Sequence, residues 1–228
     1  MSKQFSIGKE NTIRGKLLYA ILRLLMPLVR LIWIKEIKGK ENLPKKGPYI
    51  IAANHQSYMD IICLMSALPD VRLTFLAAER MFSAPCLKQL MIYTGQIKVD
   101  RKAPDKNEVI AAGLEALKNN KILAIFPQGT RSRNGKIEKA FTGVARFALE
   151  SGVPVIPVGI KNTYEILPHY KILPAMKKIV KIEIGQAINL SRFSNNLDLK
   201  NNYRLATNVI MKGIARLAEM EYKTSPNA

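Results

Sequence analysis

Residues 48–60 read PYIIAANHQSYMD, an apolar run followed directly by a polar cluster. The apolar run, 48–54, is typical of a buried strand, and residues 58–68 then carry apolar side chains every three or four positions, as a helix does. The cluster between them holds His55, one of only 2 histidines in the chain. A strand, a polar turn and a helix in this order predict one unit of an α/β fold.

The same alternation continues along the chain. Strands are predicted at 48–54, 71–77, 96–100, 121–126, 153–160 and 179–185, and helices at 58–68, 83–94, 104–119, 141–151 and 200–223. The predicted fold class is α/β, a single domain with a mixed, largely parallel sheet flanked by helices. Ligands of such sheets usually bind beyond the carboxyl ends of the strands, so the polar clusters that follow strands are the candidate functional sites.

The charge balance predicts an anionic partner. The chain of 228 residues has 36 Lys and Arg against 17 Asp and Glu, which gives a formal net charge of +19. Nucleic acid, anionic lipid or an acidic protein would satisfy this charge. Aromatic residues are only 7% of the chain and do not alternate with basic ones, which argues against nucleic acid.

The cysteines and the second histidine are interpreted as structural. Cys63 and Cys86 have no metal-ligand spacing and make no disulfide framework, so both are predicted to be reduced core residues of a cytosolic protein. His169 lies outside every motif and is predicted to be a surface or packing residue.

The N-terminal region is predicted to associate with a membrane. Residues 17–34 are mostly apolar, yet Arg23 and Arg30 lie two helical turns apart on one face and Pro27 interrupts the hydrogen-bond ladder. This favours one or two helices lying in the interface of an anionic bilayer, with Trp33 at headgroup level, over a membrane span. We therefore divide the chain into an amphipathic, helical membrane-associating segment, 1–36, and the α/β domain, 37–228. The alternative is an amphipathic helix packed on the protein's own core.

His55 and Asp60 can meet only if a helix begins between them, because two helical residues five positions apart point in different directions. Ser57 is a plausible N-cap, which leaves His55 in the preceding loop and lets Asp60 reach back to one imidazole nitrogen. The alternative is that Ser57 and Asp60 form only a capping box and that His55 simply ends a strand.

A second polar cluster, FPQGTRS at 126–132, suits an anion. Gly129 allows backbone N–H groups to approach a ligand, and Arg131 offers a fork of donors for phosphate. Arg101, at the end of another predicted strand, could supply a second guanidinium. Nucleotide-binding glycine motifs are absent from the sequence. Together with His55, these residues predict a site that binds a phosphate and removes a nearby proton.

Four motifs in this order resemble the glycerolipid acyltransferases of the 1-acylglycerol-3-phosphate (lysophosphatidate) acyltransferase type. They are NHQSYMD, the block APCLKQLMIYTGQIKVDR, FPQGTRS and VPVIPV, and the resemblance runs from about Gly39 to Gly185. Gln128 departs from the pattern, since the family usually has Glu there. VPVIPV, 153–158, would line the core or an acyl passage, although it also fits a plain buried strand.

The resemblance implies roles for these residues. His55 would be the general base that takes the proton of the acceptor hydroxyl, and Asp60 would orient its ring. The predicted substrate-binding residues are Arg101, Gln128, Gly129, Thr130 and Arg131. The reaction implied is transfer of a fatty acyl chain from acyl-CoA or acyl carrier protein to the sn-2 hydroxyl of lysophosphatidate, giving phosphatidate, without a metal or a cofactor.

The same resemblance implies a peripheral or monotopic protein at the cytoplasmic face of the cell membrane. Within the enzyme class, the alternative is a remodelling acyltransferase acting on another lysophospholipid or on an acylated amino-acid lipid. Outside it, a nucleic-acid binder and a catalytically silent membrane module remain open. The presence of both His55 and Asp60 argues against the silent module.

Overall fold

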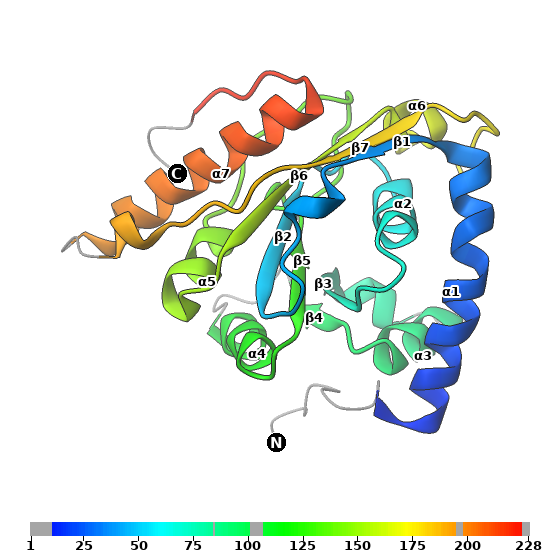
Figure 1. The fold of residues 1–228 in the computed structure, drawn as a ribbon, viewed down its shortest axis with the longest axis horizontal. Coiled ribbons are helices and arrows are strands. Elements are labelled where there is room, and N and C mark those ends of the chain that lie inside the picture. Colours follow the sequence, from blue (N-terminus) through cyan, green and yellow to red (C-terminus); the bar gives the residue numbers. More distant parts are fainter. Residues whose placement is uncertain (1–10, 84, 101–106, 195–197, 225–228) are drawn as a thin grey trace.

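A seven-stranded sheet lies at the centre of the protein, with helices on both faces (Figure 1). The structure is a computed structural model that describes residues 11–83, 85–100, 107–194 and 198–224. The strands are β1 (Ile34–Lys38), β2 (Tyr49–Ala53), β3 (Leu73–Ala78), β4 (Ile97–Val99), β5 (Ile122–Ile125), β6 (Val155–Lys161) and β7 (Val180–Ile184). Their spatial order is β1-β7-β6-β2-β5-β3-β4. Among these described strands, β6 and β7 pair antiparallel and the other neighbours pair parallel. The predicted α/β fold with a mixed, largely parallel sheet is confirmed.

The described helices largely follow the predicted ones. They are α1 (Ile13–Trp33), α2 (Met59–Ala67), α3 (Pro85–Tyr93), α4 (Asn107–Lys118), α5 (Gly143–Ser151), α6 (Thr163–Ile166) and α7 (Leu199–Ala218). The sequence prediction missed β1 and the short α6. It also extended the last helix to residue 223, whereas the left-handed backbone of Glu219, with φ 54°, ends α7 at Ala218.

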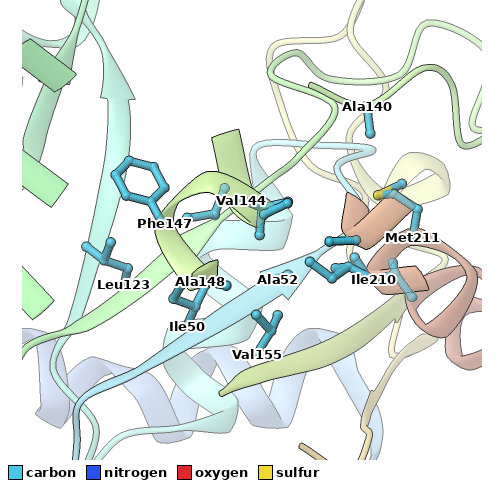
Figure 2. Close-up of a cluster of buried hydrophobic side chains, with 14 of the residues drawn as sticks. Ile50, Ala52, Leu123, Ala140, Val144, Phe147, Ala148, Val155, Ile210 and Met211 are labelled. Atoms are coloured by element: carbon cyan, nitrogen blue, oxygen red, sulfur yellow. The ribbon is translucent and has the colours of Figure 1, made fainter. Parts of the chain in front are cut away.

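The central strand β2 is covered on both faces, and all five of its residues are buried. Because side chains alternate along a strand, Ile50 and Ala52 pack on one face of the sheet with side chains of α5 and α7 (Figure 2). Tyr49, Ile51 and Ala53 pack on the other face, where α2 lies. This double packing fixes the carboxyl end of β2, from which the polar cluster at 54–60 emerges.

The N-terminal helix α1 is continuous through Pro27, so the predicted one or two helices are a single helix. Proline removes one backbone donor here without ending the helix. One face of α1 packs on α2, where Met26 is buried and its carbonyl oxygen accepts the Ser66 hydroxyl at 2.7 Å. β1 follows α1 directly and crosses residue 36, where the sequence analysis placed its boundary. Among the described residues, no helix combines the length and apolar character needed to cross a bilayer.

The structural interpretation of Cys63 and His169 is confirmed. Cys63 is a buried free thiol in α2, and His169 is exposed on the surface. The side chain of Cys86 lies outside the described part of the chain.

Candidate active site

Polar residues gather where three neighbouring parallel strands end. β2 lies between β5 and β6 and runs parallel to both, so the segments after these strands meet at one edge of the sheet. The segment after β2 carries His55 and Asp60, the segment after β5 carries Gln128 to Arg131, and α6 follows β6. This is the edge at which the sequence predicts a ligand site.

The predicted contact between His55 and Asp60 is present. His55 Nδ1 lies 2.8 Å from Asp60 Oδ2, with Asp60 completely buried and the His55 side chain 12% exposed. Because a carboxylate accepts hydrogen bonds, Nδ1 carries the proton and Nε2 is left as the basic nitrogen. The pair therefore has the geometry of an oriented general base.

Asp60 is held by three further donors. Its Oδ2 accepts the backbone N–H groups of Gln56 at 2.6 Å and Ser57 at 2.8 Å, and its Oδ1 accepts the hydroxyl of Thr163 from α6. These are the contacts that an ionised carboxylate makes. The capping interaction and the contact with His55 thus occur together, so the two interpretations of this motif are not alternatives.

Ser57 is close to its predicted capping position, although the helix begins one residue later with Tyr58 as its cap. The Ser57 hydroxyl accepts the backbone N–H of Met59 at 3.1 Å and donates to the carbonyl oxygen of Leu167 at 2.7 Å. The hydroxyl proton is committed to Leu167, which leaves Ser57 unsuited to act as a nucleophile.

The loop after β5 fixes His55 from its backbone and from its ring. Gln128 Oε1 accepts the His55 N–H at 2.9 Å, and the His55 carbonyl oxygen accepts the Ser132 N–H at 2.8 Å. The imidazole stacks on the ring of Phe126, with centroids 4.1 Å apart and planes inclined by 17°. Main chain and ring are therefore held by one segment that is distant in sequence.

Asn54 ties the end of β2 to β6. Its amide nitrogen Nδ2 donates to the carbonyl oxygen of Ile160 at 2.7 Å, and its Oδ1 accepts the Ile160 N–H at 2.8 Å. Asn54 is fully buried. The two hydrogen bonds fix the position of the His55 loop relative to α6.

Two arginines contact Tyr58, which lies in the same motif as His55 and Asp60. The guanidinium carbon of Arg131 lies 3.7 Å from the centroid of the Tyr58 ring, and Arg80 donates to the Tyr58 hydroxyl at 3.0 Å. Tyr58 thus places two arginines at one exposed spot next to the His55 loop. Tyr58 and Arg80 were not predicted as site residues from the sequence, although the position of Arg80 shortly after a predicted strand could have indicated it. Arg101, predicted to join Arg131, lies outside the described residues.

Gly129 has a conformation that only glycine adopts readily. Its φ is +67°, and a Cβ there would lie 2.9 Å from ring atoms of Phe141. Thr130 is exposed beside it, while Gln128 is 3% exposed and faces His55. Of the predicted binding residues, the structure therefore brings Gln128 to the base and places Arg131 beside Tyr58.

A metal centre finds no support in the described part of the chain, which contains no group of three or more His, Cys, Asp or Glu side chains placed to hold an ion.

Comparison with known proteins identifies the family. The acyltransferase family model matches residues 35–161, more than half of the chain. The 1-acyl-sn-glycerol-3-phosphate acyltransferase of Saccharomyces cerevisiae is 32% identical over 184 residues, which is 77% of this chain and 58% of the relative. The enzyme of the same name from Borreliella burgdorferi is 33% identical over 141 residues, 58% of this chain and 54% of the relative. The chain thus spans about half the length of these two relatives.

A solved structure extends the likeness to the whole fold. The 1-acyl-sn-glycerophosphate acyltransferase PlsC from Thermotoga maritima superposes with a TM-score of 0.70 and 26% sequence identity, covering 92% of this chain and 85% of that one. The resemblance seen in the sequence motifs is confirmed by these similarities to 1-acyl-sn-glycerol-3-phosphate acyltransferases, and the chain belongs to the acyltransferase family.

Proposed function

We propose that the protein transfers a fatty acyl chain from a thioester to the sn-2 hydroxyl of lysophosphatidate and so forms phosphatidate. The observation that carries the proposal is the contact of His55 Nδ1 with Asp60 Oδ2 at the carboxyl edge of the sheet, which orients the imidazole as a general base requires. The similar proteins are named as 1-acyl-sn-glycerol-3-phosphate or 1-acyl-sn-glycerophosphate acyltransferases, which supports lysophosphatidate as the acceptor.

The proposed chemistry is a direct transfer. Nε2 of His55 takes the proton of the sn-2 hydroxyl while the oxygen attacks the thioester carbon. The carbon–sulfur bond then breaks, and the leaving thiolate takes the proton from the imidazolium, which restores His55. Asp60 stabilises the imidazolium between these steps. No covalent enzyme intermediate is needed, in agreement with the committed hydroxyl of Ser57.

The acceptor phosphate is proposed to bind at Tyr58, where Arg131 and Arg80 converge, with Gly129 and Thr130 shaping the adjacent loop. Arginine suits this role because its planar fork can make two hydrogen bonds to one phosphate. Arg101 remains a predicted third donor. Gln128 contributes by holding His55 rather than by an observed contact near the arginines.

The proposed co-substrate is acyl-CoA or acyl carrier protein, both of which present the acyl chain as a thioester, and no cofactor or metal takes part. The proposed location is the cytoplasmic face of the cell membrane, where the protein binds an anionic lipid surface as a peripheral or monotopic protein. The exposed apolar side chains of α1 and the net charge of +19 support this.

The test is an acyl-transfer assay of the purified protein with lysophosphatidate, lysophosphatidylcholine, lysophosphatidylglycerol and an acylated amino-acid lipid, each with both thioester donors. We expect turnover with lysophosphatidate at least about tenfold above the other acceptors, because a phosphate monoester carries more charge to the arginines. Preference for another acceptor would instead establish the remodelling activity, which the motifs also allow.

A further inference from the structure

The segment between α6 and β7 exposes an unusual group of large apolar side chains. This segment, residues 168–178, is called the apolar loop below. Its exposed side chains are Tyr170 (68%), Ile172 (91%), Leu173 (80%) and Met176 (70%). Isolated exposed apolar residues are normal on a protein surface, whereas a group within seven positions marks an interaction surface.

The backbone of the apolar loop is anchored, so these side chains are not positioned to fold back on the core. Ala175 donates its N–H to the carbonyl oxygen of Ile166 in α6 at 2.8 Å. The carbonyl oxygen of Ala175 in turn accepts the indole N–H of Trp33 at 2.9 Å. The loop is thus fixed to α6 on one side and to the end of α1 on the other.

The charged side chains within the apolar loop are all lysines. Residues 166–182 contain four lysines and no acidic residue. Lys171, Lys177 and Lys178 are exposed among the apolar side chains. Apolar side chains surrounded by lysines match the interface of an anionic bilayer, where the former reach the acyl region and the latter reach the headgroups.

The apolar loop lies next to a second exposed apolar surface, on α1. α1 exposes Leu17, Ile21, Leu24, Leu28 and Leu31 at helical spacing. Figure 1 shows the segment between α6 and β7 beside the end of α1, and the hydrogen bond from Trp33 to Ala175 joins them. The two exposed apolar surfaces therefore adjoin at Trp33.

We propose that the apolar loop is a second membrane-binding element, which inserts its side chains into an anionic lipid surface beside α1. The loop adjoins the proposed active site, because the Leu167 carbonyl directly before it accepts the hydroxyl of Ser57. A loop seated in lipid therefore brings the His55 edge of the sheet close to the membrane. The inference rests on the proposed function only in taking a membrane lipid as the substrate, since binding is measured without turnover.

The test compares two variants of the full chain by flotation with phosphatidylcholine vesicles, with and without about a third of phosphatidylglycerol. The loop variant is Ile172→Ser with Leu173→Ser. The matched control is Leu199→Ser, which removes an exposed apolar side chain from α7, on the other face of the sheet. We expect the loop variant to bind anionic vesicles about tenfold more weakly than wild type, because two apolar side chains no longer enter the bilayer, and the control to bind normally.

A second measurement uses Trp33, the only tryptophan in the chain. Its indole touches the apolar loop, so brominated lipids should quench its fluorescence in the wild type and quench it less in the loop variant. Lysine variants give an independent test. A triple variant of the apolar loop, Lys171→Gln with Lys177→Gln and Lys178→Gln, should bind anionic vesicles more weakly. A control variant of α7, Lys200→Gln with Lys212→Gln, should lose much less binding.

Unchanged flotation and unchanged quenching of the loop variant would overturn the proposal. So would a loop variant that binds vesicles normally but changes from dimer to monomer in size-exclusion chromatography, because the loop would then be a contact between copies of this chain. Acyl transfer to detergent-dispersed lysophosphatidate is assayed in parallel. Its absence in the wild type would refute the proposed function while leaving the vesicle result intact.

Discussion

The side-chain oxygen of Gln128 accepts the backbone N–H of His55 at 2.9 Å, so the residue that departs from the family's usual glutamate supports the main chain of the proposed base. Gln128 is buried, and the hydrogen bond links two loops that are 73 residues apart. A glutamate would keep an acceptor oxygen at this place and add a negative charge. Replacing Gln128 with Glu therefore tests the effect of the charge while an acceptor for the His55 N–H is kept.

Gln128→Glu should leave the enzyme active but raise the KM for lysophosphatidate about tenfold, which corresponds to about 1.4 kcal/mol. The added carboxylate lies on the same loop as Arg131, three residues before it, and lowers the positive potential that this loop presents to an anion. Part of the arginine's attraction for phosphate would thus be lost. Steady-state kinetics decide the matter, and an unchanged or lower KM would refute the charge argument and indicate that Gln128 marks a changed acceptor preference.

Gln128→Met is the companion variant, because methionine keeps the volume and removes the acceptor of the His55 N–H. We expect a lower kcat with little change in KM, since the main chain of the base is then less well held while the arginines are untouched. Loss of the buried hydrogen bond should also lower the free energy of unfolding by about 1–3 kcal/mol.

His55→Ala should abolish acyl transfer, with a loss of about 10² to 10⁴ or more in kcat, without unfolding the protein. The ring is partly exposed at the sheet edge and is not part of the main hydrophobic clusters. Activity assays and thermal unfolding are measured on the same preparation. Near-normal turnover in the folded variant would exclude His55 as the base.

Thr163→Val should reduce kcat by a smaller factor, about tenfold, because it removes one donor from Asp60 and leaves the His55 contact in place. Asp60→Asn should be more severe, since its amide group cannot serve all the donors that the carboxylate accepts. If Thr163→Val lowered kcat as much as Asp60→Asn does, the contact of Asp60 with Thr163 would matter more for activity than its contact with His55.

Tyr58→Ala should raise the KM for lysophosphatidate roughly three- to thirtyfold with little effect on kcat, because Arg131 loses the ring on which it is placed and cation–π contacts are worth about 0.5–2 kcal/mol. Tyr58→Phe keeps the ring and removes only the hydroxyl that Arg80 contacts, so its effect should be smaller. Equal effects of the two variants on kcat rather than on KM would argue against a phosphate site at Tyr58.

Leu24→Ser with Leu28→Ser should weaken vesicle binding without lowering the melting temperature. Both side chains lie on the exposed stripe of α1, opposite the face that packs on α2. Substitution is preferable to removing residues 1–36, because that deletion would cut into β1, where Ile34 is buried and pairs with Val180. Full vesicle binding by the double variant would assign membrane contact to other parts of the protein.

The thiol of Cys63 should be unreactive in the folded protein. Burial and then the neighbouring Asp60 carboxylate raise the pKa of the Cys63 thiol from 9.0 to about 12. At pH 8 its thiolate fraction is thus about a thousandfold below that of the unfolded chain, and modification should follow unfolding. Because the folded pKa is raised, the contribution of this thiol to stability is present below about pH 9 and is lost as the pH rises towards 12. The measurement is thiol labelling of a Cys86→Ser variant, and fast labelling under native conditions would contradict it.

The contacts that the sequence predicted are local ones. His55 and Asp60 lie in one loop–helix junction, so spacing and capping chemistry were enough to bring them together. The contact of Gln128 with His55 and that of Thr163 with Asp60 join residues 73 and 103 positions apart. They depend on β2 lying between β5 and β6, and the order of strands in a parallel sheet is not encoded in apolar spacing.

The strand β1 escaped prediction for a different reason. It follows α1 at Ile34 without a glycine or proline to mark the change, so its residues read as the end of the preceding helix. The pairing of β1 with β7 is what establishes it as a strand, and β7 lies far along the chain. The cation pair at Tyr58 was likewise hidden, because Arg80 and Tyr58 come from separate segments.

The two hydrogen bonds between Asn54 and Ile160 mean that β2 and β6 cannot separate at their carboxyl ends without exposing two buried backbone groups. The side chains of His55, Asp60 and Thr163 are consequently preorganised before any lipid binds, and exchange of the Ile160 amide with solvent should be equally slow with and without substrate. Substrate binding then does not have to bring these three side chains into place, and the free energy of binding remains for aligning the hydroxyl with the thioester.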